Sequence, residues 1–148
     1  MFKPASGLDT AVAVRRSALD LLARREHSYA ELLRKLRQRG ASVGMAEIEL
    51  DRLQEEGLLS DERFCEAYIH ARSQRGYGPL RLREELRQRG VSEMLIDQHL
   101  HSGDQDWQAL ALKVFAKRFP EGPAEGPKER ARQQRFMQYR GFSGMPQD

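Results

Sequence analysis

The chain has 148 residues, of which 32% are charged, and its 25 basic and 22 acidic side chains give a formal net charge of +3. This length allows one ordinary domain or a few very small ones, and no window is apolar enough to predict a membrane span or a signal segment. Leu and Ala together number 33, whereas Val, Ile and Thr number nine, which favours helices over sheets. A single cysteine excludes an internal disulfide and a cysteine-rich metal site, as is typical of a reducing cytoplasm.

An internal repeat organises the chain at a spacing of fifty residues. The stretch LLRKLRQRGAS over 32–42 returns as LREELRQRGVS over 82–92, and a weaker third copy ends in RGFS over 140–143. Each copy follows a helical stretch, and the first two copies also precede one. These flanking stretches cover 17–26, 44–56, 60–75, 92–101 and 104–119. The sequence therefore predicts an all-α fold of tandem three-helix repeats, of which the last lacks its third helix.

The repeat also predicts where the chain divides. A unit of about fifty residues buries too small a hydrophobic core to be stable alone, so neighbouring repeats are expected to pack against each other. The expected divisions are a loose N-terminal tail over 1–10 and repeats over 11–57, 58–102 and 103–148.

Local signals mark where these helices begin. Ser28 with Glu31 is a capping-box pattern, in which the hydroxyl and the carboxylate each accept a free backbone N–H. Gly78 before Pro79 is a permissive cap residue followed by a proline at the first helical position. Ser60 is expected to cap the helix over 60–75. The apolar spacing predicts that this helix buries the side chains of Phe64, Ala67, Tyr68 and Ala71.

Charge is segregated in register with the repeat. Three segments are basic, with net charges of +4 over 24–39, +4 over 71–90 and +5 over 113–140. Between them, 44–62 carries a net charge of −6, and 92–106 has four acidic and no basic residues. Any one such segment is adequately explained as a solvated helix face, but three at a fixed period favour a binding surface. Either nucleic-acid phosphates or an acidic protein surface could bind to this basic surface and neutralise its charge.

No catalytic constellation is predicted. Cys65 has no His at helical spacing to activate it and is interpreted as a small packing residue. His99 and His101 are two apart, so on a helix they point to different faces and make a poor metal pair. We therefore expect no catalytic residue, no metal and no cofactor.

The stretch over 57–92, GLLSDERFCEAYIHARSQRGYGPLRLREELRQRGVS, resembles the central signature of the bacterial RecX regulatory proteins. The residues that carry the resemblance are Asp61, Arg63, Phe64, Gly76, Gly78, Pro79 and the helix over 82–90. The likeness covers about residues 12–143. The family pattern continues with a final helix after the third repeat element, whereas this sequence has GFSGMPQD there.

The resemblance implies a function as well as a fold. Members form elongated, curved, basic molecules that act as negative modulators of RecA in recombination, DNA repair and the SOS response. They bind the RecA filament on single-stranded DNA, lodge in its groove, and block filament extension, ATP hydrolysis and strand exchange. The chain is thus expected to be a cytoplasmic monomer whose partners are RecA and single-stranded DNA, with double-stranded DNA as a further candidate.

The basic segments supply the candidate contacts to DNA or RecA. These are Arg34, Arg37, Arg39, Arg72, Arg75, Arg81, Arg83, Arg87, Arg89, Arg130, Arg132 and Arg135. Tyr77 is a candidate for stacking on a base, although a turn residue that packs on the next helix explains it equally well. Asp61, Arg63 and Phe64 are interpreted as a cap, an interhelical ion pair and a core residue. Two alternatives stay open: a free-standing nucleic-acid-binding repeat module, and a scaffold for an acidic protein partner.

Overall fold

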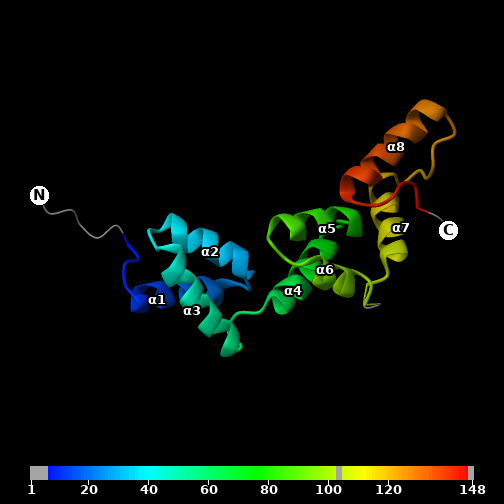
Figure 1. Ribbon diagram of the computed structural model, residues 1–148. Coiled ribbons are helices and arrows are strands. Elements are labelled where there is room, and N and C mark those ends of the chain that lie inside the picture. Colours follow the sequence, from blue (N-terminus) through cyan, green and yellow to red (C-terminus); the bar gives the residue numbers. More distant parts are fainter. Residues whose placement is uncertain (1–6, 103–104, 147–148) are drawn as a thin grey trace, which may run out of the picture. The chain divides into compact units, whose positions relative to one another are not determined.

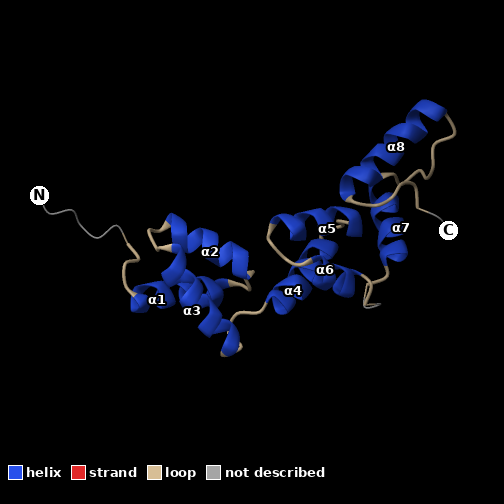
Figure 2. Cartoon of the chain, viewed as in Figure 1, coloured by secondary structure: helices blue, strands red, loops and turns tan. Residues whose placement is uncertain are grey.

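A computed structural model describes residues 7–102 and 105–146, and within these ranges every regular element is a helix (Figures 1 and 2). The helices are α1 Ala11–Arg24, α2 Tyr29–Gln38, α3 Val43–Glu55, α4 Asp61–Gln74, α5 Pro79–Gln88, α6 Glu93–Leu100, α7 Trp107–Arg118 and α8 Pro127–Arg140. The predicted all-α class is confirmed, and so is a third repeat of two helices, α7 and α8. The predicted loose tail over 1–10 falls largely on residues 1–6, which lie outside the described residues.

The predicted caps are confirmed. The Ser28 hydroxyl accepts from the Glu31 N–H at 3.0 Å, and the Glu31 carboxylate accepts from the Ser28 N–H at 3.1 Å. Ser60 caps α4 by accepting from the Arg63 N–H at 3.1 Å. Asp61 differs from the expectation, because its carboxylate accepts from the Tyr29 N–H of α2 at 2.8 Å. Asp61 thus caps the start of another helix, in agreement with the positive dipole there.

The predicted inner face of α4 is partly wrong. Phe64 is buried as expected, but Ala67 and Ala71 are exposed and Tyr68 is only half-buried. Cys65 and Ile69 are buried instead. A methyl side chain gains little from burial, so the larger Ile69 decides which face turns inward.

The chain divides into two compact units, one comprising Met1–Ala67 with Arg89–Val91 and the other comprising Tyr68–Gln88 with Ser92–Asp148. In the first unit, α3 packs against both α1 and α2. The core between them is built mainly from leucine and alanine, which agrees with the composition. Its buried members are Val14, Ala18, Leu21, Leu32, Leu36, Ala41, Ala46, Leu50, Leu53 and Leu59.

The second unit contains the rest of α4 together with α5 to α8. Leu82 and Leu86 of α5 are fully buried, as is Ile96 of α6, which packs against α5; Leu100 of α6 is also buried. A further cluster joins α7 to α8 and the segment after it. This cluster comprises Ala111, Phe115, Met137 and Phe142, flanked by partly buried Leu110, Val114, Phe119, Phe136 and Met145.

The repeated Arg-Gly dipeptide makes the same kind of contact three times. The glycine adopts a positive φ at the end of the helix, and the arginine carbonyl accepts a hydrogen bond from an earlier part of the chain. The three bonds are Leu8 N–H to Arg39 O (3.3 Å), Ser28 Oγ–H to Arg89 O (2.7 Å) and Gly78 N–H to Arg140 O (2.7 Å). Because the last carbonyls of a helix lack intrahelical partners, these bonds stabilise the helix end and anchor an earlier segment to it. The repeated sequence therefore marks a repeated contact, in which the end of one helix is hydrogen-bonded to an earlier segment of the chain.

Candidate nucleic-acid and protein interface

Six of the twelve predicted arginines make ion pairs with described residues, and five of these six approach a carboxylate to 3.3 Å or less. Arg72 and Arg81 share the carboxylate of Glu85, which also accepts from the Tyr68 hydroxyl. The pairs of these five are Arg72–Glu85 (3.1 Å), Arg81–Glu85 (3.0 Å), Arg83–Glu93 (3.3 Å) with Arg83–Asp97, Arg87–Glu84 (2.8 Å) with Arg87–Glu93, and Arg89–Glu31 (2.7 Å). A guanidinium held by a carboxylate is less available to a phosphate, since binding would have to break the existing pair. These five arginines therefore mainly stabilise the fold.

The Glu85 carboxylate illustrates how firmly such arginines are held. Burial by itself would raise the pKa of Glu85, but hydrogen bonds from Arg72, Arg81 and Tyr68 outweigh burial and lower the pKa below its ordinary value. The carboxylate therefore stays ionised throughout the neutral range and keeps both arginines in place.

Three further predicted arginines make weaker contacts. The Arg39 guanidinium donates to the Ser17 hydroxyl at 2.6 Å, and that of Arg130 donates to the Ala124 carbonyl at 3.3 Å. Arg132 lies 3.6 Å from Glu129, one turn away on an exposed face of α8. Exposed pairs of this kind contribute little and are readily exchanged.

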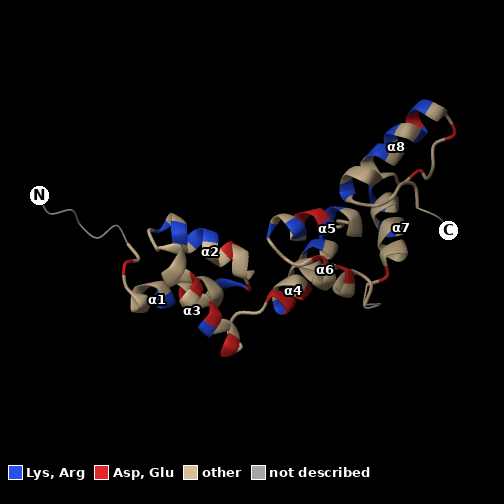
Figure 3. Cartoon of the chain, viewed as in Figure 1, with Lys and Arg blue, Asp and Glu red and all other residues tan. Residues whose placement is uncertain are grey.

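The remaining four are Arg34, Arg37, Arg75 and Arg135. All four are exposed, and their side chains make no hydrogen bond or ion pair with any residue in 7–102 or 105–146. Arg34 and Arg37 lie on α2, where Figure 3 shows basic residues, whereas neighbouring α3 shows acidic ones. Each of the three basic segments thus retains at least one arginine whose charge no described carboxylate neutralises.

Tyr77 lies among arginines. The guanidinium carbons of Arg72, Arg81 and Arg140 lie 4.0, 4.4 and 5.1 Å from the centre of its ring. Such cation–π contacts stabilise the turn before α5 and occupy ring surface that a base would need. Base stacking by Tyr77 stays a prediction, and it would require these guanidinium groups to move.

A groove in the second unit gathers cations that the sequence-based selection missed. It encloses about 640 Å³ between the end of α4, one face of α7 and the C-terminal part of α8. Its basic lining residues are Arg75, Lys113, Lys117, Arg118 and Arg140. Only Arg75 was among the predicted contacts. The other four belong to the basic segment over 113–140, whose net charge is +5. The i, i+4 spacing of Lys113 and Lys117 could have indicated that both lie on one basic face of a helix.

Cys65 is fully buried, and burial, reinforced by the carboxylates of Glu66, Asp61 and Glu62, raises its pKa to about 11. We expect iodoacetamide at pH 8 to leave the native protein unmodified and to alkylate Cys65 promptly in guanidinium chloride, because the thiolate is the reactive form. Mass spectrometry over a time course measures this. Alkylation of native and denatured protein at equal rates would contradict the burial of the thiol.

None of the helices in the described ranges combines the length and the apolar character that crossing a membrane requires.

Comparison with protein families finds three consecutive matches. The domain described as "RecX, first three-helix domain" matches residues 15–53, the second three-helix domain matches residues 60–100, and the third matches residues 104–144. The third of these domains covers α7 and α8 in this chain.

Two curated relatives are similar over most of their length. The regulatory protein RecX of Pseudomonas entomophila (strain L48) is 55% identical over 136 residues, which cover 92% of this chain and 88% of the relative. That of Pseudomonas putida (strain GB-1) is 54% identical over 135 residues, covering 91% and 86%.

Two solved structures share the fold. RecX from Lactobacillus salivarius superposes with a TM-score of 0.74 at 16% identity, covering 90% of this chain and 88% of that one. A second structure, of a regulatory protein RecX, gives a TM-score of 0.68 at 24% identity, with coverages of 90% and 69%.

Proposed function

Since this chain belongs to the RecX family of non-enzymatic regulatory proteins, we propose that it binds the RecA filament on single-stranded DNA and inhibits filament extension, ATP hydrolysis and strand exchange. It thereby regulates recombination and DNA repair as a negative modulator. It acts in the cytoplasm as a monomer whose repeats cover 11–57, 58–102 and 103–148.

The observation that carries the proposal is a set of four exposed arginines without an ion-pair partner among the residues that the structure describes, namely Arg34, Arg37, Arg75 and Arg135. An arginine without a carboxylate partner gains from meeting a phosphate, because neutralising phosphates releases counterions. Its planar fork also fits a protein carboxylate. A filament offers both kinds of group along its groove, so unpaired arginines in every basic segment are well suited to follow it.

Arg34 and Arg37 provide the sharpest test, because their side chains support no other described part of the fold. In a RecA ATPase assay on single-stranded DNA, the wild-type protein is expected to lower steady-state hydrolysis at substoichiometric ratios. Arg34→Glu combined with Arg37→Glu should raise the concentration needed for half inhibition by about tenfold, since two attractions become repulsions. Reversing Arg83 and Arg87 would be a poorer test, because it also breaks their ion pairs with Glu93 and Glu84.

Arg16 supplies the matched control. It is exposed on α1 in the same unit, and its side chain bonds to no residue in the described ranges. Arg16→Glu changes the net charge as much as the single variant Arg37→Glu does. If the position of the charge matters, Arg37→Glu should weaken inhibition and Arg16→Glu should not. If the double variant inhibits RecA as well as the wild type while remaining folded, these arginines do not contact the filament.

The salt dependence separates contacts to DNA from contacts to RecA. On single-stranded DNA alone, the logarithm of the binding constant should fall with the logarithm of salt concentration by about 0.7 per phosphate contact. Loss of two phosphate contacts in the double variant reduces this slope accordingly. An unchanged slope with weakened inhibition would assign the two arginines to carboxylates on RecA.

A further inference from the structure

The groove in the second unit has apolar as well as basic lining residues. Leu110 and Val114 of α7 and Phe136 of α8, here called the floor, are all only partly buried by their neighbours, and the basic lining residues are here called the rim. Ala109, which directly precedes Leu110 on α7, is exposed at the same groove. The hollow of about 640 Å³ is large enough for one or two side chains of a bound chain.

The rim carries far more positive than negative charge. Five basic residues line the groove, and Asp106 is the one acidic residue among the described residues that line it. The Asp106 carboxylate is occupied, because it accepts from the Ala109 N–H at 3.0 Å as the cap of α7. Lys113 and Lys117 are exposed and make no hydrogen bond or ion pair within the described ranges. The rim therefore presents unneutralised charge to a ligand.

The floor favours an apolar side chain over a nucleic-acid base. Base stacking needs a free ring face. The one aromatic ring that lines the groove, Phe136, already has the Arg118 and Arg140 guanidinium carbons 5.6 and 5.3 Å from its centre, and it meets Phe119 edge-on at 5.5 Å. Leu110 and Val114 offer only hydrocarbon surface, which gains free energy when another apolar side chain covers it.

We propose that this groove binds an acidic peptide segment of a partner protein, with an apolar side chain of the peptide seated on Leu110 and Val114 and flanking carboxylates held by Lys113 and Lys117. Charge complementarity selects the acidic segment, and the floor selects the register in which it lies. Binding at this groove is separate from the role of Arg34 and Arg37 and requires neither RecA nor DNA.

Fluorescence anisotropy tests the proposal with defined probes. The main probe is a short fluorescein-labelled peptide of Asp and Glu with a central Leu-Phe pair. A second peptide replaces that pair with Ser-Ser, and a third probe is labelled oligothymidylate. The full-length wild-type protein should bind the Leu-Phe peptide several-fold more tightly than the Ser-Ser peptide.

Two variants separate charge from shape. Lys113→Glu with Lys117→Glu should weaken binding of the Leu-Phe peptide by about tenfold, because both rim cations become repulsive. Ala109→Trp fills the floor while every cation remains, so it should weaken the same peptide and leave oligothymidylate binding unchanged.

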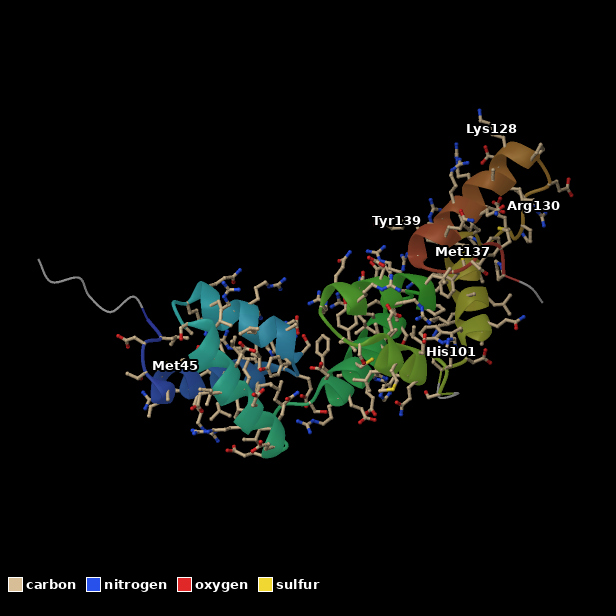
Figure 4. The ribbon with its side chains drawn as sticks, in the orientation of Figure 1. Met45, His101, Lys128, Arg130, Met137 and Tyr139 are labelled. Atoms are coloured by element: carbon tan, nitrogen blue, oxygen red, sulfur yellow. The ribbon has the colours of Figure 1, made fainter. Side chains whose placement is uncertain are left out.

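The matched control is Lys128→Glu with Arg16→Glu, which makes the same change in net charge at two exposed residues outside the groove lining. Lys128 lies at the N-terminal end of α8, whereas Tyr139 lies near its C-terminal end (Figure 4). This variant should bind the Leu-Phe peptide as the wild type does. Circular dichroism melts verify that each variant is folded, and Lys113→Ala with Lys117→Ala replaces the reversal if the latter unfolds.

The opposite pattern would overturn the proposal. If both acidic peptides bind alike, the apolar residues do not select the ligand and the proposal is wrong. If Ala109→Trp impairs oligothymidylate and spares the peptide, the groove is a nucleic-acid site. Since no measurement here includes RecA, such a result leaves the proposed inhibition of RecA to its own assay.

Discussion

Replacing Glu31 with alanine is expected to lower the free energy of unfolding by about 2–4 kcal/mol. Glu31 is 2% exposed and accepts hydrogen bonds from three groups. Both of its oxygens accept from Arg25 at 3.2 Å, one accepts from Arg89 at 2.7 Å, and one from the Ser28 N–H at 3.1 Å. The substitution removes the capping box and deprives two guanidinium groups of their carboxylate at once.

Urea denaturation followed by circular dichroism measures this loss. Glu31→Gln should cost less than Glu31→Ala, because an amide keeps the size and one acceptor but not the charge. Glu55 is the matched control, since it is an exposed glutamate on α3 whose side chain bonds to no described residue. Glu55→Ala is expected to change stability by less than about 0.5 kcal/mol. A similar loss from both alanine variants would mean that the Glu31 network contributes nothing specific.

The same carboxylate makes stability depend on pH. Burial by itself raises the pKa of Glu31, but the bonds from Arg25, the Ser28 N–H and Arg89 outweigh burial and lower the pKa below its ordinary value. The unfolded chain therefore binds this proton more readily than the folded one. The stabilisation by the carboxylate is present above the unfolded pKa and is lost as the pH falls through the folded pKa. The stability difference between the wild type and Glu31→Gln should accordingly be larger at pH 7 than at pH 3.

Gly78→Ala is expected to destabilise the protein by about 2–4 kcal/mol, because the start of α5 and the end of α8 meet through two glycines. A Cβ at Gly78 would lie 2.6 Å from the Gly141 oxygen and 2.8 Å from Cδ1 of Phe142. Two backbone hydrogen bonds join the same segments, from the Gly78 N–H to the Arg140 carbonyl at 2.7 Å and from the Leu80 N–H to the Gly141 carbonyl at 3.0 Å. The added methyl group would force the two segments apart and lengthen these hydrogen bonds.

Thermal unfolding monitored by circular dichroism reports the effect. Gly44→Ala is the control, because Gly44 lies in α3 and a Cβ there would meet no heavy atom within 4 Å. That substitution should instead stabilise the protein by roughly 0.5–1 kcal/mol, as alanine favours the helix. If Gly78→Ala melts at the wild-type temperature, the contact between the two glycines is not tight.

The elements of this fold were predictable because their signals are local. The capping box of Ser28 and Glu31 spans three residues, and the Arg-Gly helix ends follow from backbone conformation near the glycine. The buried face of α4 was predicted less well. Its choice between Ala67 and Ile69 depends on what other helices bring against it, which spacing within one helix does not reveal.

The functional surface was predictable only in outline. The all-α chain of repeats, the ends of its helices and the three basic segments follow from the sequence, because each depends on residues within a few turns of one another. Which arginines have no ion-pair partner among the described residues depends on the tertiary fold. Arg89 meets Glu31 from 58 positions away, whereas Arg34 meets no carboxylate of residues 7–102 or 105–146. A charge is neutralised by the group that folding places beside it, and that group is usually distant in the sequence.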